Sequence, residues 1–306
     1  MKKKHVVIVT QSAQHLFPAN RRTIVGMSRA AQPAIVFPTA NKEGLYRFPD
    51  GEVYLRVPGL KHIERATIVH SGYPDPSGGI IELLMILNIL RKYAPNMERA
   101  HVIFTSMQYA RQDNAWYDGE LNMAQMLIDM LDLRFGVNAI STIDAHFARE
   151  DWVRPYSILT DVSAVENLMD KAIADYPGII FVTPDAGAQR RIRIKMAAGA
   201  KKKRANSFDV SVMLDEKFAS VIKGKVVGVV DDILSTGNTL VRFAEQARKL
   251  GAKKVVALIT HGVGSAGISR VQKEFDGLYL TNTINHPEAN VDIRGLVDTC
   301  ILQDRL

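Results

Sequence analysis

Residues 226–240 read VVGVVDDILSTGNTL. The unbroken apolar run at 226–230 is typical of a strand that is covered on both faces, and two carboxylates, Asp231 and Asp232, follow it. A short Ser/Thr/Gly turn comes next. From residue 238 to 250, apolar residues recur at the spacing of one helix face. Strand, polar turn and helix in this order form the basic unit of an α/β sheet.

The same alternation runs through the whole chain. Helical periodicity also predicts helices at 80–90, 121–133 and 162–174, and the first of these is apolar nearly all round, so we expect it to be buried, at a subunit contact. The pattern predicts an α/β fold of two stacked domains, 1–150 and 151–306, each with a mainly parallel central sheet flanked by helices. Apolar runs predict strands at residues 6–9, 34–37, 67–70, 101–105, 139–143, 178–182, 226–230, 255–259 and 277–280.

The composition is that of a folded protein with a surplus of basic groups. The 306 residues include 39 Lys and Arg against 32 Asp and Glu, a net charge of +7, and 47% are hydrophobic, which excludes general disorder. Because Cys300 is the one cysteine, no intrachain disulfide can form, and a reducing, cytoplasmic setting is expected. The longest apolar stretch is too short for a membrane span. The positive charge fits nucleic acid, a membrane surface or a small polyphosphate.

The turn at residues 235–239 suits a phosphate monoester. It offers backbone N–H groups, hydroxyls and a helix N-terminus, and the carboxylates of Asp231 and Asp232 suit ribose hydroxyls, directly or through a divalent cation. The ordinary alternative is an acidic strand end followed by a helix cap. The string resembles the phosphoribosyl-diphosphate motif of type I phosphoribosyltransferases and their relatives. By itself it leaves open whether the protein makes or consumes that compound.

Four further segments suit a polyphosphate ligand, although each has an ordinary alternative as a solvated turn, a polar loop or a structural histidine. Three of them follow predicted strands, where parallel sheets bind ligands. A run of four cations, Lys201–Arg204, lies between two such loops and is a candidate for closing over phosphates. The segments are FPDGE at 48–52, YARQD at 109–113, DAH at 144–146 and TPDAG at 183–187.

Together with the basic run and residues 231–239, these segments resemble, in the same order, the ribose-phosphate pyrophosphokinases (phosphoribosyl-diphosphate synthetases). Each segment is moderately specific, whereas the co-linear set is highly specific, and the resemblance covers nearly the whole chain. It implies that both domains have type I phosphoribosyltransferase-like topology. It also implies transfer of the β,γ-diphosphate of ATP to the 1-hydroxyl of ribose 5-phosphate, with Mg²⁺ as the cofactor, in a cytoplasmic homo-oligomer (a dimer, or a hexamer built from dimers).

The resemblance also implies a role for each matching residue. Lys202 and Arg204 correspond to the catalytic cations, and His146 and Asp185 to magnesium-site residues. The ATP-site residues are Phe48, Asp50, Glu52, Arg111 and Gln112. Ribose 5-phosphate is assigned to Asp231, Asp232, Ser235, Thr236, Gly237, Asn238 and Thr239.

Three departures from the family pattern indicate a divergent member. Ser235 stands where these synthetases usually carry a third aspartate, Ala188 replaces a glycine, and residues 114–119 replace a basic segment that serves subunit contacts and regulation. Three other functions remain open. A non-catalytic regulatory paralogue is disfavoured by the retained cations, and a phosphoribosyltransferase by the two nucleotide motifs. A nucleic-acid binder is disfavoured because the sequence has no basic stripe interleaved with aromatic residues.

Overall fold

The computed structural model describes residues 5–21, 23–184, 188, 198–199, 201–204, 210–213 and 219–303. The chain divides into two compact units, Met1–Val162 with Arg294–Leu306, and Ser163–Ile293. The sequence placed the boundary at residue 150 and the C-terminal segment in the second domain. In the structure, strand β6 (Leu159–Val162) and helix α8 (Arg294–Gln303) belong to the first unit, because β6 pairs with the strand at residues 139–143 and α8 packs on the same sheet.

The first unit is built on a six-stranded parallel sheet in the order β2-β1-β3-β4-β5-β6. Its central strands are buried along almost their whole length, as expected for Val/Ile runs that are covered on both faces. The short edge strand β6 lacks such a run and was not predicted. The other strands are β1 (His5–Val9), β2 (Ala34–Val36), β3 (Arg65–Ser71), β4 (Arg99–Ser106) and β5 (Ala139–Ile143).

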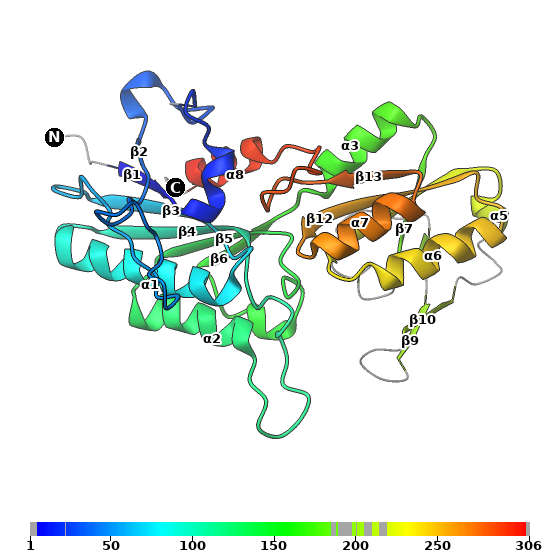
Figure 1. Ribbon diagram of the computed structural model, residues 1–306, viewed down its shortest axis with the longest axis horizontal. Helices are drawn as coiled ribbons and strands as arrows, with labels where there is room; N and C mark the ends of the chain where they lie inside the picture. The colour runs from blue at the N-terminus through cyan, green and yellow to red at the C-terminus, as the bar shows by residue number, and fades with distance from the viewer. Residues whose placement is uncertain are drawn as a thin grey trace. The chain divides into compact units, whose positions relative to one another are not determined.

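Helices cover both faces of this sheet (Figure 1). One face packs its main hydrophobic core against α1 (Pro76–Tyr93) and α2 (Met123–Asp129). The opposite face lies under α8, whose Val297, Cys300 and Ile301 are buried. Asp298 of α8 forms an ion pair with Arg21 and accepts a hydrogen bond from the backbone N–H of Val25 at 3.2 Å. Short 3₁₀ turns complete the unit: η1 (Gln11–Leu16), η2 (Arg29–Ala31) and η4 (Asp151–Val153).

Helices α1 and α2 differ from their predicted bounds for local reasons. Helix α1 begins at Pro76 rather than at residue 80, because Asp75 caps it by accepting a hydrogen bond from the Gly78 N–H at 3.0 Å. Helix α2 begins after its own cap, Asn122, and continues as the π-helical turn η3 (Met130–Arg134). The prediction that α1 is buried holds for one side, since Leu83, Ile86, Leu87 and Leu90 are buried while Ile81 is half exposed.

The second unit contains a five-stranded parallel sheet in the order β13-β12-β11-β7-β8. Helices α6 (Asn238–Lys249) and α7 (Ser265–Glu274) form a hydrophobic core on one face, and α3 (Val165–Asp175) forms another on the opposite face. Both sheets are therefore parallel and flanked by helices, which confirms the predicted fold class. The strands are β7 (Ile180–Thr183), β8 (Ala198–Gly199), β11 (Val226–Leu234), β12 (Lys254–Gly262) and β13 (Gly277–Leu280).

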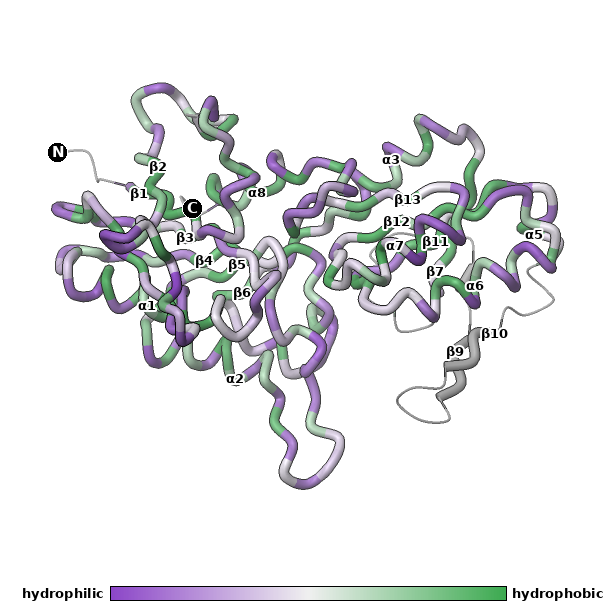
Figure 2. Tube along the Cα trace, viewed as in Figure 1, coloured by the Kyte–Doolittle hydropathy of each residue, from purple (hydrophilic) through white to green (hydrophobic). Residues whose placement is uncertain are grey.

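Figure 2 shows hydrophobic residues concentrated along the strands of both sheets, with more hydrophilic residues in many of the connecting loops. A separate antiparallel pair joins β9 (Lys201–Arg204) to β10 (Val210–Met213), and a short helix, α5 (Ala219–Ile222), precedes β11. The backbone of the basic run forms β9. Among the residues that the structure describes, no helix combines the length and the apolar character needed to traverse a bilayer.

Candidate active site

In the first unit, the predicted ATP-site residues of segment 48–52 lie on a tight hairpin. The Phe48 N–H donates to the Glu52 carbonyl and the Gly51 N–H to the Phe48 carbonyl, both at 2.9 Å. Gly51 has φ +94°, which only glycine adopts readily. Asp50 accepts a hydrogen bond from the Glu52 N–H at 3.1 Å, and both carboxylates are exposed. The hairpin thus presents two carboxylates to solvent on a defined backbone.

Phe48 stands beside these carboxylates with 39% of its surface exposed. Its ring meets Tyr54 edge to face, with 5.9 Å between the ring centroids, and this contact fixes its orientation. An exposed phenylalanine in a fixed orientation is suited to stacking against a planar ring.

The hairpin is attached to the first turn of α1. Arg47 donates to the Gly51 carbonyl at 3.0 Å and forms an ion pair with Asp75, the residue that caps α1. A groove of about 550 Å³ lies between hairpin and helix. Its lining includes Glu52, which the sequence assigned to ATP, together with Arg47, Gly51, Val53, Asp75, Ser77, Gly78 and Ile81.

The second nucleotide segment, residues 109–113, reaches the same helix turn. Tyr109 adopts φ +58°, an uncommon backbone conformation for a non-glycine residue, and its hydroxyl lies 2.9 Å from Oγ of Ser77. Arg111 and Gln112 are exposed. Tyr73 lies close enough to Arg111 for that charge to act on its hydroxyl: burial raises the pKa of Tyr73, and Arg111 partly opposes the rise.

A network of buried polar side chains lies next to this loop. His70 is completely buried at the end of β3, with Nδ1 3.2 Å from Thr10 Oγ1 and Nε2 3.4 Å from the side-chain nitrogen of Gln108. Burial lowers the pKa of His70 to about 3, so the ring is neutral at physiological pH. The network therefore connects the ends of β1 and β3 to the start of the nucleotide loop.

The structure also brings residue 113 to the predicted magnesium residue His146. Asp113 is buried, which raises its pKa, and the largest opposing influence is the charge of His146. Asp144, two residues before His146, adopts φ +42°. Asp113 was not among the predicted site residues. The YARQD segment contained it, but only the tertiary structure places it near His146.

In the second unit, β11 continues four residues beyond its predicted end and includes both aspartates. Asp231 pairs with Ile259 of β12, and Asp231 and Asp232, as neighbours in a strand, direct their side chains to opposite faces. Asp231 is half-buried, and Asp232 is buried. The two carboxylates thus differ in their access to a ligand at this edge.

The phosphate loop follows β11 and opens α6. Gly237, with φ +76°, is the N-cap of this helix, and Thr236 and Asn238 on either side of it are exposed, while Ser235 and Thr239 are half-buried. The loop therefore lies at a helix N-terminus and presents exposed polar side chains, as expected from the sequence, and the structure adds a glycine in the left-handed conformation.

Three predicted residues cannot be placed as side chains. Asp185 lies outside the described residues. Lys202 and Arg204 are described as backbone in β9, where they pair with Val212 and Val210. Their catalytic and magnesium-binding roles stay predictions.

The first unit offers few side chains that could bind a magnesium ion. Within the described ranges, no three His, Cys, Asp or Glu side chains form a cluster that could hold a metal. Mg²⁺ usually binds proteins through one or two carboxylates and otherwise through substrate phosphates and water. The nearby Asp113 and His146 agree with such a sparse site, with Asp113 as the oxygen ligand that Mg²⁺ prefers.

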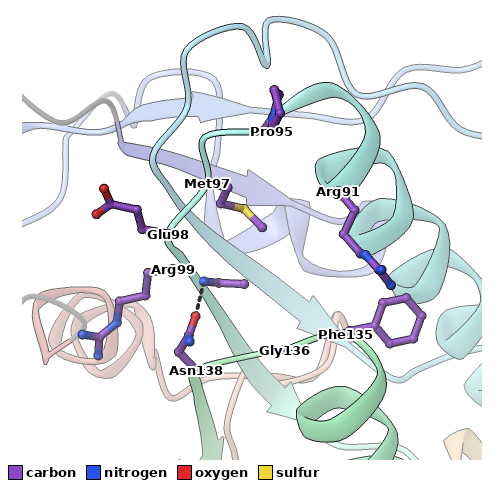
Figure 3. A pocket seen from close by; sticks show the side chains of 10 residues that line it. Arg91, Pro95, Met97, Glu98, Arg99, Phe135, Gly136 and Asn138 are labelled. Carbon is purple, nitrogen blue, oxygen red and sulfur yellow. Dashed lines mark hydrogen bonds between the residues drawn. The ribbon is translucent and has the colours of Figure 1, made fainter.

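A second pocket, of about 240 Å³, lies at the amino ends of β4 and β5, the opposite edge of the first sheet (Figure 3). Arg91 at its rim donates to the Arg134 carbonyl at 3.3 Å, and Asn138 accepts a hydrogen bond from the Ala100 N–H at 2.9 Å. None of the predicted site residues lines it. This pocket therefore does not belong to the candidate active site.

The amino-acid sequence is similar to those of known proteins. The ribose-phosphate pyrophosphokinase of Pyrococcus furiosus is 33% identical over 273 residues, which cover 84% of this chain and 90% of that protein. The chain belongs to the ribose-phosphate pyrophosphokinase family. The Thermococcus kodakarensis member of this family is also 33% identical, over 81% of this chain and 87% of its own.

The fold agrees with this family. The crystal structure of phosphoribosylpyrophosphate synthetase from Mycobacterium smegmatis superposes with a TM-score of 0.73, covers 98% of both chains and has 21% sequence identity. No family model matches the chain. The motif resemblance seen in the sequence is thus confirmed at the level of the family.

Proposed function

We propose that this protein is a ribose-phosphate diphosphokinase. In this reaction the 1-hydroxyl oxygen of ribose 5-phosphate attacks the β-phosphorus of ATP. An O–P bond forms, the bond between the β-phosphorus and the oxygen bridging to the α-phosphate breaks, AMP leaves, and the hydroxyl proton is released. The observation that carries the proposal is the partly exposed phosphate loop at the N-terminus of α6, in a member of this family.

We assign ribose 5-phosphate to the second unit. The loop from Ser235 to Thr239 offers backbone N–H groups and hydroxyls at a helix N-terminus, which suits the 5-phosphate. Asp231, half-buried at the end of β11, suits the ribose hydroxyls. Ser235 accepts and donates hydrogen bonds but carries no charge, so it adds no repulsion next to a phosphate.

ATP is assigned to the exposed residues of the first unit. Phe48 would stack against the base, Arg111 would bind phosphate oxygens, and Gln112 would recognise a polar edge of the nucleotide. Both segments are anchored to the first turn of α1, through Arg47–Asp75 and through Tyr109–Ser77. Such anchoring limits the motion of binding groups and so favours a productive orientation.

Lys202 and Arg204 are the proposed catalytic cations. Phosphoryl-type transfer spreads negative charge over the migrating group, so cations at these two positions would lower the barrier. Magnesium would neutralise part of the same charge: His146 and Asp113 are the candidate residues for it in the first unit, and Asp185 is a separate candidate in the second. We also expect the protein to act as a homo-oligomer, and the mass in solution by light scattering tests this.

The decisive assay measures AMP release from ATP. We expect AMP only when ribose 5-phosphate and Mg²⁺ are both present, with phosphoribosyl diphosphate as the second product. Lys202→Ala and Arg204→Ala should each lower kcat by about a hundredfold. Lys249→Ala, which removes an exposed cation from the end of α6, is the matched control and should leave kcat unchanged.

Other outcomes identify the alternatives. A protein that forms no AMP with any divalent ion but assembles with an active synthetase would be a regulatory paralogue. A protein that instead releases diphosphate from phosphoribosyl diphosphate in the presence of a base would be a phosphoribosyltransferase. Repeating the assay with inorganic phosphate and ADP then determines whether the changed segment at 114–119 alters regulation.

A further inference from the structure

The phosphate loop rests on α7, a helix that the proposed function does not use. Gly237 packs against this helix: a Cβ at Gly237 would lie 3.2 Å from the Gly267 carbonyl oxygen and 3.3 Å from Val271 Cγ2. Helix α7 belongs to the same unit as the loop, and its first turns lie beside α6 in Figure 1. The contact leaves little space on this side of the glycine at the centre of the loop.

Three successive backbone carbonyls at the loop entrance are directed at the connection to α7 or at α7 itself. The Leu234 carbonyl accepts hydrogen bonds from Val263 N–H at 2.9 Å and Gly264 N–H at 3.3 Å. The Ser235 carbonyl lies against the backbone of Gly264 and Gly267, where a Cβ on either glycine would overlap the oxygen. These two glycines are therefore required for the close approach.

The third carbonyl is held by a side chain. Arg270 Nη1 donates to the Thr236 carbonyl at 2.9 Å and also to the side-chain oxygen of Asn238. Arg270 is exposed and lies one turn beyond Gly267 on α7. One guanidinium thus bonds to the residues on both sides of Gly237.

The direction of these carbonyls fixes the direction of the loop amides. A trans peptide unit is planar, so the carbonyl of one residue and the N–H of the next point in opposite directions. Because the carbonyls of residues 234, 235 and 236 face α7 or its connection, the N–H groups of Ser235, Thr236 and Gly237 point away from it. Consecutive amides in one direction form a concave site for an anion.

We propose that Arg270 is a positioning residue for phosphate binding: it holds the Thr236–Gly237 peptide so that the Gly237 N–H faces the 5-phosphate of the substrate. The inference rests on the proposed function, because it names the support of the same phosphate loop. Without Arg270, the peptide before a glycine is free to rotate, since glycine populates both signs of φ. A rotated peptide would present a carbonyl oxygen to the phosphate and repel it.

The test compares Arg270→Ala and Arg270→Lys with Lys273→Ala, which removes an exposed cation one turn further along α7. For Arg270→Ala we expect the KM for ribose 5-phosphate to rise about tenfold to a hundredfold, with the KM for ATP unchanged. Arg270→Lys should restore part of the affinity, because an ammonium can reach one of the two acceptors. Lys273→Ala should match the wild type in both constants.

Hydrogen–deuterium exchange gives a readout independent of catalysis. In Arg270→Ala, the amides of residues 235–241 should exchange faster, while those of β11 and β12 remain protected. Equal rises in both KM values, faster exchange throughout the second unit, or an unchanged KM and exchange in the loop would each overturn the proposal.

A wild-type protein that forms no AMP contradicts the proposed function rather than this inference. In that case calorimetric titration with ribose 5-phosphate tests Arg270 directly. Weaker binding by Arg270→Ala than by Lys273→Ala supports the positioning role, and equal binding contradicts it.

Discussion

The hydroxyl of Tyr109 and Oγ of Ser77 lie 2.9 Å apart and join the nucleotide loop to the first turn of α1. The same turn holds the 48–52 hairpin through the ion pair between Asp75 and Arg47. Two segments separated by more than fifty residues in sequence are thus fixed to one helix end. The position of α1 therefore determines where the proposed ATP groups stand.

Replacing Tyr109 with phenylalanine tests the first of these anchors. Tyr109→Phe removes one hydrogen bond and keeps the ring, so we expect the KM for ATP to rise about threefold to tenfold, with the KM for ribose 5-phosphate unchanged. Steady-state kinetics with each substrate varied measures both. Tyr117→Phe is the control, because Tyr117 is 77% exposed. Equal values for Tyr109→Phe and wild type would show that the anchor does not matter for nucleotide binding.

The ion pair between Arg21 and Asp298 should make a large contribution to stability. Both side chains are almost fully buried, at 11% and 5% exposure, so Asp298→Asn leaves a buried guanidinium without its counter-ion. We expect the free energy of unfolding to fall by about 3 kcal/mol, as measured by urea denaturation.

The matched control for Asp298 is Asp151→Asn, which breaks the exposed pair between Asp151 and Arg154. It should change the free energy of unfolding by less than about 1 kcal/mol. A similar small effect for Asp298→Asn would mean that α8 does not depend on this ion pair.

Two buried histidines should make the protein less stable in mild acid. Burial lowers the pKa of His70 and of His101 to about 3, and for His101 the charges of Arg99 and Arg65 add to the effect. The unfolded chain protonates these rings below about pH 6.5, while the folded state does not until about pH 3, so stability falls across this window. At pH 5 each histidine should cost about 2 kcal/mol.

Urea denaturation at pH 7 and pH 5 measures this loss. His101→Gln can still reach Ser141, 2.8 Å from the native ring nitrogen, but does not titrate, so it should lose about 2 kcal/mol less than the wild type on acidification. His62→Gln, at an exposed position, should behave like the wild type. Parallel pH dependence in His101→Gln and wild type would contradict the assignment.

Cys300 should be chemically inert in the folded protein. The side chain is completely buried on α8, and burial raises its pKa to about 11, so almost no thiolate exists at neutral pH. We expect no reaction with a thiol reagent under native conditions and one reactive thiol in guanidinium chloride. Rapid modification of the native protein would show that α8 opens readily.

The sequence alone was sufficient to predict those features that depend on residues close together in the chain. Short β-rich runs, most of them continuous Val/Ile segments, identified nine of the strands that the structure describes, because strands that are covered on both faces are largely apolar. The co-linear motifs at 48–52, 109–113, 144–146, 183–187, 201–204 and 231–239 indicated the family, because its chemistry requires particular residues in a particular order. The edge strand β6 and the strand pair β9–β10 were not predicted, because they have no continuous apolar run.

Only the tertiary structure decided which residues support the motifs. Ser77, Asp113 and Arg270 are ordinary polar residues in the sequence. They gain their roles because the fold places them at the Tyr109 hydroxyl, beside His146 and at the Thr236 carbonyl. Such pairs are separated by about thirty residues, and their contact depends on helix packing that no local pattern encodes. The sequence determined which functional side chains the motifs contain, and helix packing decided which other residues contact those motifs.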